Sequence, residues 1–414
     1  MKVLLVHNEY QQPGGEDTVF GLEHGLLSRL GHQVVTYKRS NHEISRYTPA
    51  RRLLLVRQMT WARDAQRDIA GLLRSERPDI VHVHNTFTQI SPSIYAECKK
   101  AEVPVVQTLH NFRLLCPSAT FYRDGHICDE CVTRGLHRSV LHGCYRNSRL
   151  ATAAVAGMLA THRRLSTWSH DINSYIALTE FARQQFISGG LPGEKICVKP
   201  NFVDPDPGQG TQSGWYAIFV GRLSPEKGLK TLLKAWFRLG NSIPLRIVGD
   251  GPLRPELAKF AEQEGLSSVH FVGRLNRTET QEAIKEARFL ILPSVCYENF
   301  PMTIAEAFAA GTPVICSRLG AMQEVVTHQH NGLHFDAGNS EQLADRVAWG
   351  WEHPGRMRTM GRAARREFEL KYTAEKNHSM LMEIYHQAMR QPSALHDQTD
   401  RQSELVAASS PDIR

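Results

Sequence analysis

The sequence has no long apolar segment. The apolar run after Lys2 lasts only four residues, which is too short for the h-region of a signal peptide. The longest stretch of small apolar residues, Ala151–Ala160, has about half the length that a bilayer span requires. We therefore expect a cytoplasmic protein without a transmembrane helix, whose only membrane association would be peripheral, at the inner membrane face.

Cysteine is scarce, and no basic run interleaved with aromatic residues surrounds the part of the chain where cysteines gather. Eight cysteines in 414 residues, without export, indicate reduced thiols or metal ligands and not a disulfide framework. The formal net charge of +7 favours anionic partners. A nucleic-acid-binding module would use this charge, but the missing basic and aromatic pattern argues against it.

The chain alternates short β-rich apolar runs with helical patterns, and this rhythm is interrupted once. The interruption, residues 199–214, is rich in proline and glycine and reads as a linker. The alternation predicts a parallel sheet with helices on both faces in each half. The predicted strands are Val3–Val6, Val34–Tyr37, Asp79–His84, Val103–His110 and Ser174–Thr179, then Tyr216–Gly221, Leu245–Gly249, Val269–Gly273, Phe289–Pro293 and Pro313–Ser317.

This pattern predicts an α/β fold of two doubly wound, Rossmann-like domains that face a central cleft. Ligands of such sheets bind beyond the carboxyl ends of the strands, so the cleft is the expected active site. The expected divisions are a first domain over residues 1–200, a second over 201–375, a C-terminal helix over 376–390 that returns to the first domain, and a disordered tail over 391–414.

The stretch ENFPMTIAEAFAAGTPV, Glu298–Val314, predicts a buried helix with an N-terminus open to a ligand. Asn299 suits the N-cap and Pro301 suits the first turn, and the free N–H groups of such an end bind anions. Between Met302 and Ala310 only Thr303 and Glu306 are polar. A buried glutamate needs a partner, and the hydroxyls of a ribose would satisfy it. The alternatives are an internal arginine or a neutral, core-packed acid.

A second segment, GRLSPEKGLKTLLKAW (Gly221–Trp236), places two cations at a helix start, where positive charge is disfavoured. A bound diphosphate would offset this unfavourable positive charge, because Arg222 can form two hydrogen bonds to phosphate oxygens while Lys227 supplies a point charge. The alternative is that Glu226 and solvent screen both cations.

These segments resemble a known family. Glu298 and Glu306 match the E-x7-E motif of the retaining family-4 glycosyltransferases, which have the GT-B architecture, and GRLSPEKG, VGDGPLR and FVGRL precede the motif in the family's order. The likeness spans roughly residues 1–390. It implies that Arg222 and Lys227 hold the donor diphosphate, that Glu298 contacts the donor sugar, and that Glu306 binds the ribose. The remaining donor contacts that it implies are the amides of Asn299, Phe300, Pro301 and Met302, and a nucleobase segment of Gly273, Arg274 and Leu275.

In the first domain, the resemblance implies that Gly15 lets the backbone approach the donor phosphates or the acceptor, and that His110 lies near the sugar. The usual family pattern at this point is His-Asp. Asn111 departs from it, so no acid–base role is assigned to position 111.

The implied reaction transfers a hexose-type sugar from a UDP- or GDP-linked donor, with retention, to a glycan or lipid-linked acceptor in cell-surface polysaccharide biosynthesis. Cations and a helix N-terminus would neutralise the leaving group, so no catalytic metal is expected. The alternative enzyme is a nucleotide-sugar epimerase of the same architecture, which needs no acceptor.

Four cysteines gather in an insertion, residues 116–144. Cys128 and Cys131 have zinc-knuckle spacing, and Cys116 and Cys144 flank them. Asp124-Gly125 predicts a hairpin turn between them. We predict a structural zinc site, with free thiols, disulfides or a metal cluster as the alternatives.

The segment Arg46–Arg67 carries six arginines among leucines and a tryptophan. Such a surface suits contact with an anionic membrane. The alternative, which we favour, is a solvated helix whose leucines pack on the domain.

Overall fold

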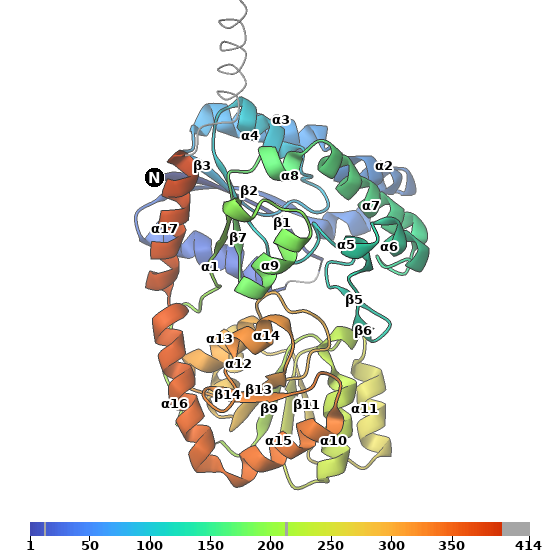
Figure 1. Ribbon diagram of the computed structural model, residues 1–414, viewed down its shortest axis with the longest axis vertical. Coiled ribbons are helices and arrows are strands. Elements are labelled where there is room, and N and C mark those ends of the chain that lie inside the picture. The colour runs from blue at the N-terminus through green and yellow to red at the C-terminus, as the bar shows by residue number, and fades with distance from the viewer. Residues whose placement is uncertain (12–13, 212–213, 391–414) are drawn as a thin grey trace, which may run out of the picture.

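The computed structural model describes residues 1–11, 14–211 and 214–390. Two six-stranded parallel sheets form its two halves, one above the other in Figure 1. The first sheet contains β1 (Lys2–Glu9), β2 (Gln33–Ser40), β3 (Ile80–Asn85), β4 (Val105–Thr108), β7 (Ser174–Ala177) and β8 (Ile196–Val198). The second contains β9 (Ala217–Val220), β10 (Leu245–Val248), β11 (Val269–Gly273), β12 (Phe289–Leu292), β13 (Val314–Ser317) and β14 (Gly332–Phe335). The predicted α/β fold of two doubly wound units is confirmed.

Helices cover both faces of each sheet. Those of the first half are α1 (Gly15–Arg29), α2 (Pro49–Thr60), α3 (Arg63–Glu76), α4 (Ile94–Lys100), α5 (Glu130–Thr133), α6 (His137–His142), α7 (Arg149–Arg164), α8 (Thr167–His170) and α9 (Glu180–Ser188). Those of the second half are α10 (Leu229–Leu239), α11 (Arg254–Gln263), α12 (Arg277–Lys285), α13 (Met302–Ala309), α14 (Gly320–Val325), α15 (Ser340–Glu352), α16 (Pro354–Lys371) and α17 (Ala374–Arg390). Short 3-10 turns lie at Asn41–Arg46, Gly193–Lys195 and Pro225–Lys227.

The strand orders explain the near-continuous apolar runs of the central strands. The first sheet runs β2-β1-β3-β4-β7-β8 and the second runs β11-β10-β9-β12-β13-β14. A central parallel strand is covered on both faces and therefore needs apolar residues throughout. Val3 to Val6 of β1 are accordingly fully buried. In each sheet the chain reverses its direction of winding beside the first strand, which places a ligand crevice at the ends of β1 and β3 and of β9 and β12.

The chain crosses back to the first half at its end. The α17 helix packs against α1 and β4, and the Tyr385 hydroxyl lies 2.8 Å from His82 Nδ1. In Figure 1, α16 and α17 run along one side of both halves. Residues of the linker contact these two helices: Asp206 pairs with Arg365 of α16, and Asn377 of α17 donates to the Pro200 carbonyl oxygen.

Several local predictions can be compared directly with the structure. The Asp124-Gly125 turn joins β5 (Tyr122–Arg123) to β6 (His126–Ile127), and both turn residues have positive φ, as predicted. Strands β8 and β14 were missed because each is short and lies at a sheet edge. The expected tail, residues 391–414, and linker residues 212 and 213 lie outside the described residues.

The arginine-rich segment folds as α2 and the start of α3. Met59 is buried, but Leu54 and Val56 are 57% and 45% exposed, so these two side chains do not pack on the domain as the favoured interpretation requires. No helix in the described part of the chain is long and apolar enough to cross a membrane.

Candidate active site

The second sheet brings the predicted diphosphate ligands and the sugar-contacting glutamate together. Strands β9 and β12 are neighbours, and their carboxyl ends lead to Arg222 and to Glu298. Lys227 Nζ lies 2.6 Å from Glu298 Oε1. The Ser294 hydroxyl donates a second hydrogen bond of 2.6 Å to the same oxygen. Residues that are 71 apart in sequence therefore share one charged site.

The charge balance of this site is explained by the ion pair. Burial would raise the pKa of Glu298, but the attraction of Lys227 outweighs burial and holds that pKa below its usual range. Glu298 is accordingly ionised at neutral pH. Arg222 is exposed at the rim of the site, so its guanidinium is available to an anion.

Two glycines let the loops of this site approach one another. A Cβ on Gly228, at φ +71°, would lie 1.8 Å from the carbonyl oxygen of Pro293, at the end of β12. A Cβ on Gly249 would lie 1.9 Å from the carbonyl oxygen of Gly221. Both positions combine positive φ with backbone contact, so only glycine satisfies them.

The buried helix begins later than predicted. Helix α13 starts at Met302 and Pro301 is its N-cap residue, so the assignment of Asn299 as the N-cap was wrong. Asn299 is used between the two halves: its side-chain amide donates to the carbonyl oxygen of Leu109, and its own carbonyl accepts from the Thr179 hydroxyl. The start of α13 is thereby held beside His110, which follows Leu109.

Glu306 lies on α13, as predicted, and is half-buried. Burial raises its pKa, and Arg277 counteracts this only in part. Arg277 directs its guanidinium to the carbonyl oxygen of Asp204 instead. Within the described residues no side-chain hydrogen bond or ion pair of the Glu306 carboxylate is formed. The alternative of an internal arginine partner is therefore not realised as a direct contact.

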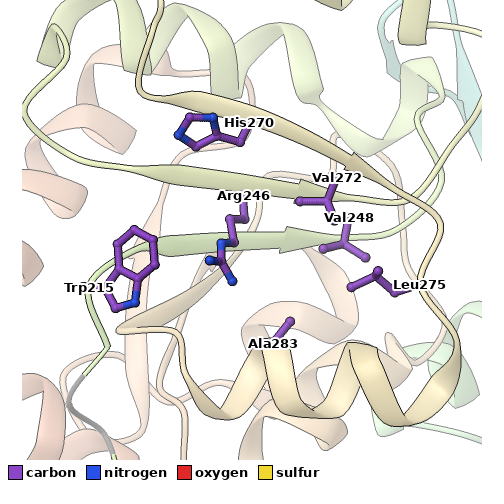
Figure 2. Close-up of a pocket in the computed structure, with 7 residues that line it drawn as sticks. All are labelled: Trp215, Arg246, Val248, His270, Val272, Leu275 and Ala283. Atoms are coloured by element: carbon purple, nitrogen blue, oxygen red, sulfur yellow. The ribbon is translucent and has the colours of Figure 1, made fainter.

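The predicted nucleobase segment opens onto a groove of about 440 Å³ (Figure 2). Leu275 lines the groove together with apolar residues of β10, β11 and α12, and Trp215 and Arg246 lie at the end away from Leu275. The Arg246 guanidinium lies 4.9 Å from the centre of the Trp215 ring. A flat apolar ring system could be accommodated at the Leu275 end, in keeping with the predicted role of the segment Gly273–Leu275.

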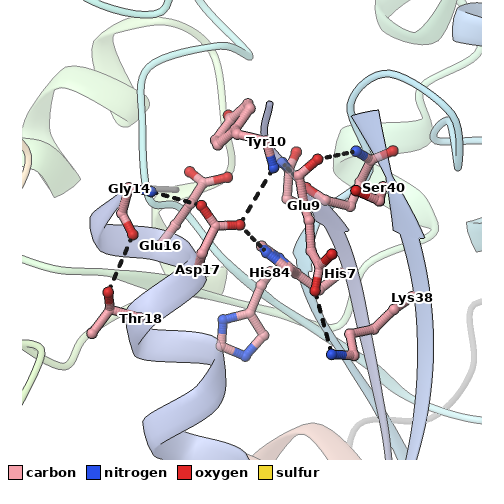
Figure 3. A network of polar contacts seen from close by, with 12 residues as sticks. His7, Glu9, Tyr10, Gly14, Glu16, Asp17, Thr18, Lys38, Ser40 and His84 are labelled. Carbon is pink, nitrogen blue, oxygen red and sulfur yellow. Dashed lines mark hydrogen bonds and ion pairs between the residues drawn. The ribbon is translucent and has the colours of Figure 1, made fainter. Parts of the chain in front are cut away.

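The glycine loop of the first half faces α13. A Cβ on Gly15 would lie 3.8 Å from Met302 Cγ, so the loop and the start of α13 are adjacent. Asp17 holds the loop: its carboxylate accepts from the Gly14 amide at 2.8 Å and contacts His7 Nε2 at 2.8 Å (Figure 3). The loop that carries Gly15 is therefore anchored to β1.

His110 belongs to a buried polar cluster that the sequence did not reveal. Its Nε2 lies 2.9 Å from His84 Nδ1, and His84 Nε2 lies 3.2 Å from Glu23 Oε2. Lys199 Nζ pairs with Glu23 Oε1 at 2.7 Å. Burial keeps the pKa of His110 well below its usual value, so its ring is neutral. The available signal was His82-Val83-His84, two polar residues on one face of an otherwise apolar strand.

Among the described residues, one group of three side chains has metal-ligand atoms within 4.8 Å of one another: Glu23, His82 and His84. The ammonium of Lys199 already neutralises Glu23, and His82 Nε2 is engaged by the Thr108 hydroxyl at 2.7 Å. A cation would have to displace a buried lysine. The cluster is better explained as a neutralised polar core beneath His110.

Replacing Lys199 by methionine should destabilise the protein by about 3–5 kcal/mol, because it leaves the Glu23 carboxylate buried without its cation. Burial alone would raise the pKa of the Glu23 carboxyl, but Lys199, His84 and His82 together hold that pKa well below its usual range. The stabilisation is therefore fully present above the ordinary glutamate pKa and is lost as the pH falls from there through the lowered pKa of the folded state, so the difference in stability between wild type and variant should shrink as the pH falls. Denaturant unfolding at pH 7 and pH 4 measures both effects. Lys38→Met, which breaks the exposed pair with Glu9, should cost less than about 1 kcal/mol.

The predicted zinc site is not supported. Cys116 and Cys131 are buried and contact each other, whereas Cys128 and Cys144 are only half-buried. In the described part of the chain no three of these four sulfurs lie within 4.8 Å of one another. None of the eight cysteines, all of which lie in the described part of the chain, forms a disulfide. The hairpin turn brings the four residues into one region but does not make their sulfurs converge.

Known proteins resemble the chain over both halves. Residues 208–367 match the family described as Glycosyl transferases group 1, and residues 14–207 match Glycosyltransferase Family 4. An uncharacterized glycosyltransferase of Methanocaldococcus jannaschii is 25% identical over 363 residues, which are 80% of this chain and 84% of the relative. The D-rhamnosyltransferase WbpZ of Pseudomonas aeruginosa is 32% identical over 161 residues, which are 38% of this chain and 42% of the relative.

Solved structures share the fold. The crystal structure of HepE from Anabaena in complex with UDP superposes with a TM-score of 0.67 at 18% identity, over 92% of this chain and 99% of HepE. Sucrose-phosphate synthase from Thermosynechococcus elongatus superposes with a TM-score of 0.69 at 16% identity, over 93% of this chain and 98% of that enzyme.

Proposed function

We propose, because this chain belongs to glycosyltransferase family 4, that it moves a hexose from a UDP- or GDP-linked donor to a hydroxyl group of a glycan or lipid-linked acceptor. The family comprises retaining hexosyltransferases that use nucleotide sugars. We propose in addition that the donor is UDP- or GDP-linked and that the enzyme acts in cell-surface polysaccharide biosynthesis.

One observation carries the proposal: Lys227, Glu298 and the start of α13 meet at the ends of β9 and β12, directly opposite His110. Departure of a nucleoside diphosphate creates negative charge, and fixed cations and free helix amides stabilise such charge most in a site that excludes water. Arg222 and Lys227 supply the cations. Glu298 pairs with Lys227, so a donor sugar that engages Glu298 would release the lysine toward the phosphates.

Relatives support the choice of donor class. HepE from Anabaena has been crystallised with UDP-glucose, and relatives that match part of this chain include an O-antigen chain mannosyltransferase of Escherichia coli. The first points to a uridine diphosphate donor and the second to transfer onto a surface glycan.

Thermal shift with UDP, GDP, UDP-glucose and GDP-mannose tests the proposal first, because a ligand that binds the native state raises the melting temperature. The donor that binds is then incubated with and without glycoside acceptors. Formation of an α-linked product only with an acceptor supports transfer. Conversion of the donor alone into an epimeric sugar nucleotide would establish the epimerase alternative instead.

Glu306→Gln should weaken binding of the nucleotide by about tenfold, because the amide has a single, uncharged accepting oxygen, whereas a carboxylate accepts the two ribose hydroxyls through two oxygens. Isothermal titration with the nucleoside diphosphate measures this. Glu264→Gln, an exposed change in the same half, serves as the control. Equal affinity in wild type and Glu306→Gln would contradict the assignment of Glu306 to the ribose.

A further inference from the structure

A carboxylate from another part of the chain lies where the family's His-Asp pattern is broken. Asn111 directs its side-chain amide to Glu16 Oε2 at 2.9 Å and to the Tyr10 hydroxyl at 3.2 Å. Its side-chain oxygen accepts from the Arg113 amide at 3.0 Å. The amide nitrogen of Asn111 therefore holds Glu16 in place, and its amide oxygen fixes the loop to which Asn111 belongs.

The second oxygen of Glu16 has no partner. Glu16 is only 8% exposed, and its Oε1 atom is buried without a hydrogen bond among the residues that the structure describes. Leaving a buried carboxylate oxygen unpaired costs free energy, so such an atom persists where a ligand satisfies it.

The location of Glu16 indicates which ligand this is. Gly15 precedes it and abuts Met302 of α13, while Asn111 follows His110, so Glu16 lies on the wall of the first half beside the donor site. Figure 3 shows its carboxylate next to the Tyr10 ring, above the turn that Asp17 holds. In its ionised form Glu16 repels the oxygens of a diphosphate but accepts a hydrogen bond from a hydroxyl group. The donor sugar already has Glu298 on the opposite wall.

We propose that Glu16 binds the acceptor, and that its Oε1 atom accepts a hydrogen bond from a hydroxyl group of the incoming sugar or polyol. This inference rests on the proposed glycosyltransferase function. Asn111 is a positioning residue that fixes Glu16 Oε2 so that Oε1 faces the acceptor. The carboxylate missing from position 111 is thus supplied from the start of α1.

Ionisation of Glu16 has a measurable consequence. Burial raises the pKa of Glu16 to about 8; the charge of Asp17 also raises it, whereas the hydrogen bonds from Asn111 and Tyr10 and the charge of Arg113 lower it. Only the ionised form accepts through both oxygens. Acceptor use should therefore increase as the pH rises through this pKa.

Glu16→Gln tests the inference directly. The assay uses UDP-glucose or GDP-mannose, whichever binds the wild type, with the octyl glycosides of glucose, galactose and mannose as acceptors. We expect kcat/KM for the glycoside to fall about 10- to 100-fold, while the Kd of the nucleotide and its release rate without acceptor stay within twofold. Glu43→Gln, an exposed carboxylate of the same half, should behave as the wild type. An unchanged kcat/KM, or an equal loss in donor binding, would overturn the proposal.

A measurement on the wild type covers the case in which Glu16→Gln does not fold. Between pH 6.5 and 9.5, kcat/KM for the glycoside should rise through about pH 8 while the Kd of the nucleotide does not follow it. A flat profile for the glycoside would overturn the proposal. Failure of every nucleotide sugar to bind would instead contradict the proposed function, so the two failures are distinguishable.

Discussion

Arg222→Ala should lower the rate of sugar transfer about 100- to 1,000-fold and leave the melting temperature unchanged. The guanidinium is exposed at the end of β9, so its removal disturbs no packing. The substitution would, however, remove one of the two cations that stabilise the leaving diphosphate. Loss of one such group typically lowers kcat about 100- to 1,000-fold. Initial rates at saturating donor measure the change.

Lys227→Ala should lower the rate as strongly, but it also leaves the buried Glu298 without its cation. The double variant Lys227→Ala/Glu298→Gln removes that charge and separates stability from catalysis. Lys230→Ala is the matched control, because Lys230 lies on the exposed side of α10, just after the turn that carries Lys227, and pairs with Glu256. Transfer by Arg222→Ala at a rate near that of the wild type would refute the diphosphate assignment.

Gly228→Ala should destabilise the second half by about 4 kcal/mol or prevent it from folding. The added Cβ would lie 1.8 Å from the carbonyl oxygen of Pro293, which is backbone at the end of a central strand and cannot move aside. Positive φ adds about 1–2 kcal/mol to this steric cost. The midpoint of denaturant unfolding, followed through the fluorescence of the buried Trp236, measures the loss.

The control for this substitution is Gly265→Ala. Gly265 also has positive φ, +64°, but a Cβ there would meet no atom within 4 Å. It should cost only the backbone strain, about 1–2 kcal/mol. If both variants lost the same stability, close approach of the loops after β9 and β12 would not be the reason for glycine at position 228.

The amino-acid sequence by itself determined the fold class and predicted the residues of a donor site. Apolar runs such as Val3–Val6 are long enough for a parallel strand and too short for a helix, and their alternation with helical patterns admits few architectures. Arg222 and Lys227 follow one such run and Glu298 follows another. The family resemblance predicted that these residues act together, and the pairing of β9 with β12 supplies the physical reason, because the carboxyl ends of adjacent parallel strands meet.

Only the tertiary structure decided the features that depend on distant contacts. Asn299 has the chemistry of an N-cap, yet it bonds the Leu109 carbonyl of the other half, because a backbone acceptor buried between the halves needs a donor. Cysteine spacing predicted a zinc site, but spacing along the chain does not orient side chains, and the sulfurs do not converge. Likewise no local pattern pairs Glu16 with Asn111, 95 positions later, or Glu23 with Lys199, 176 positions later. Burial makes these polar contacts strong, and burial is a property of the assembled fold.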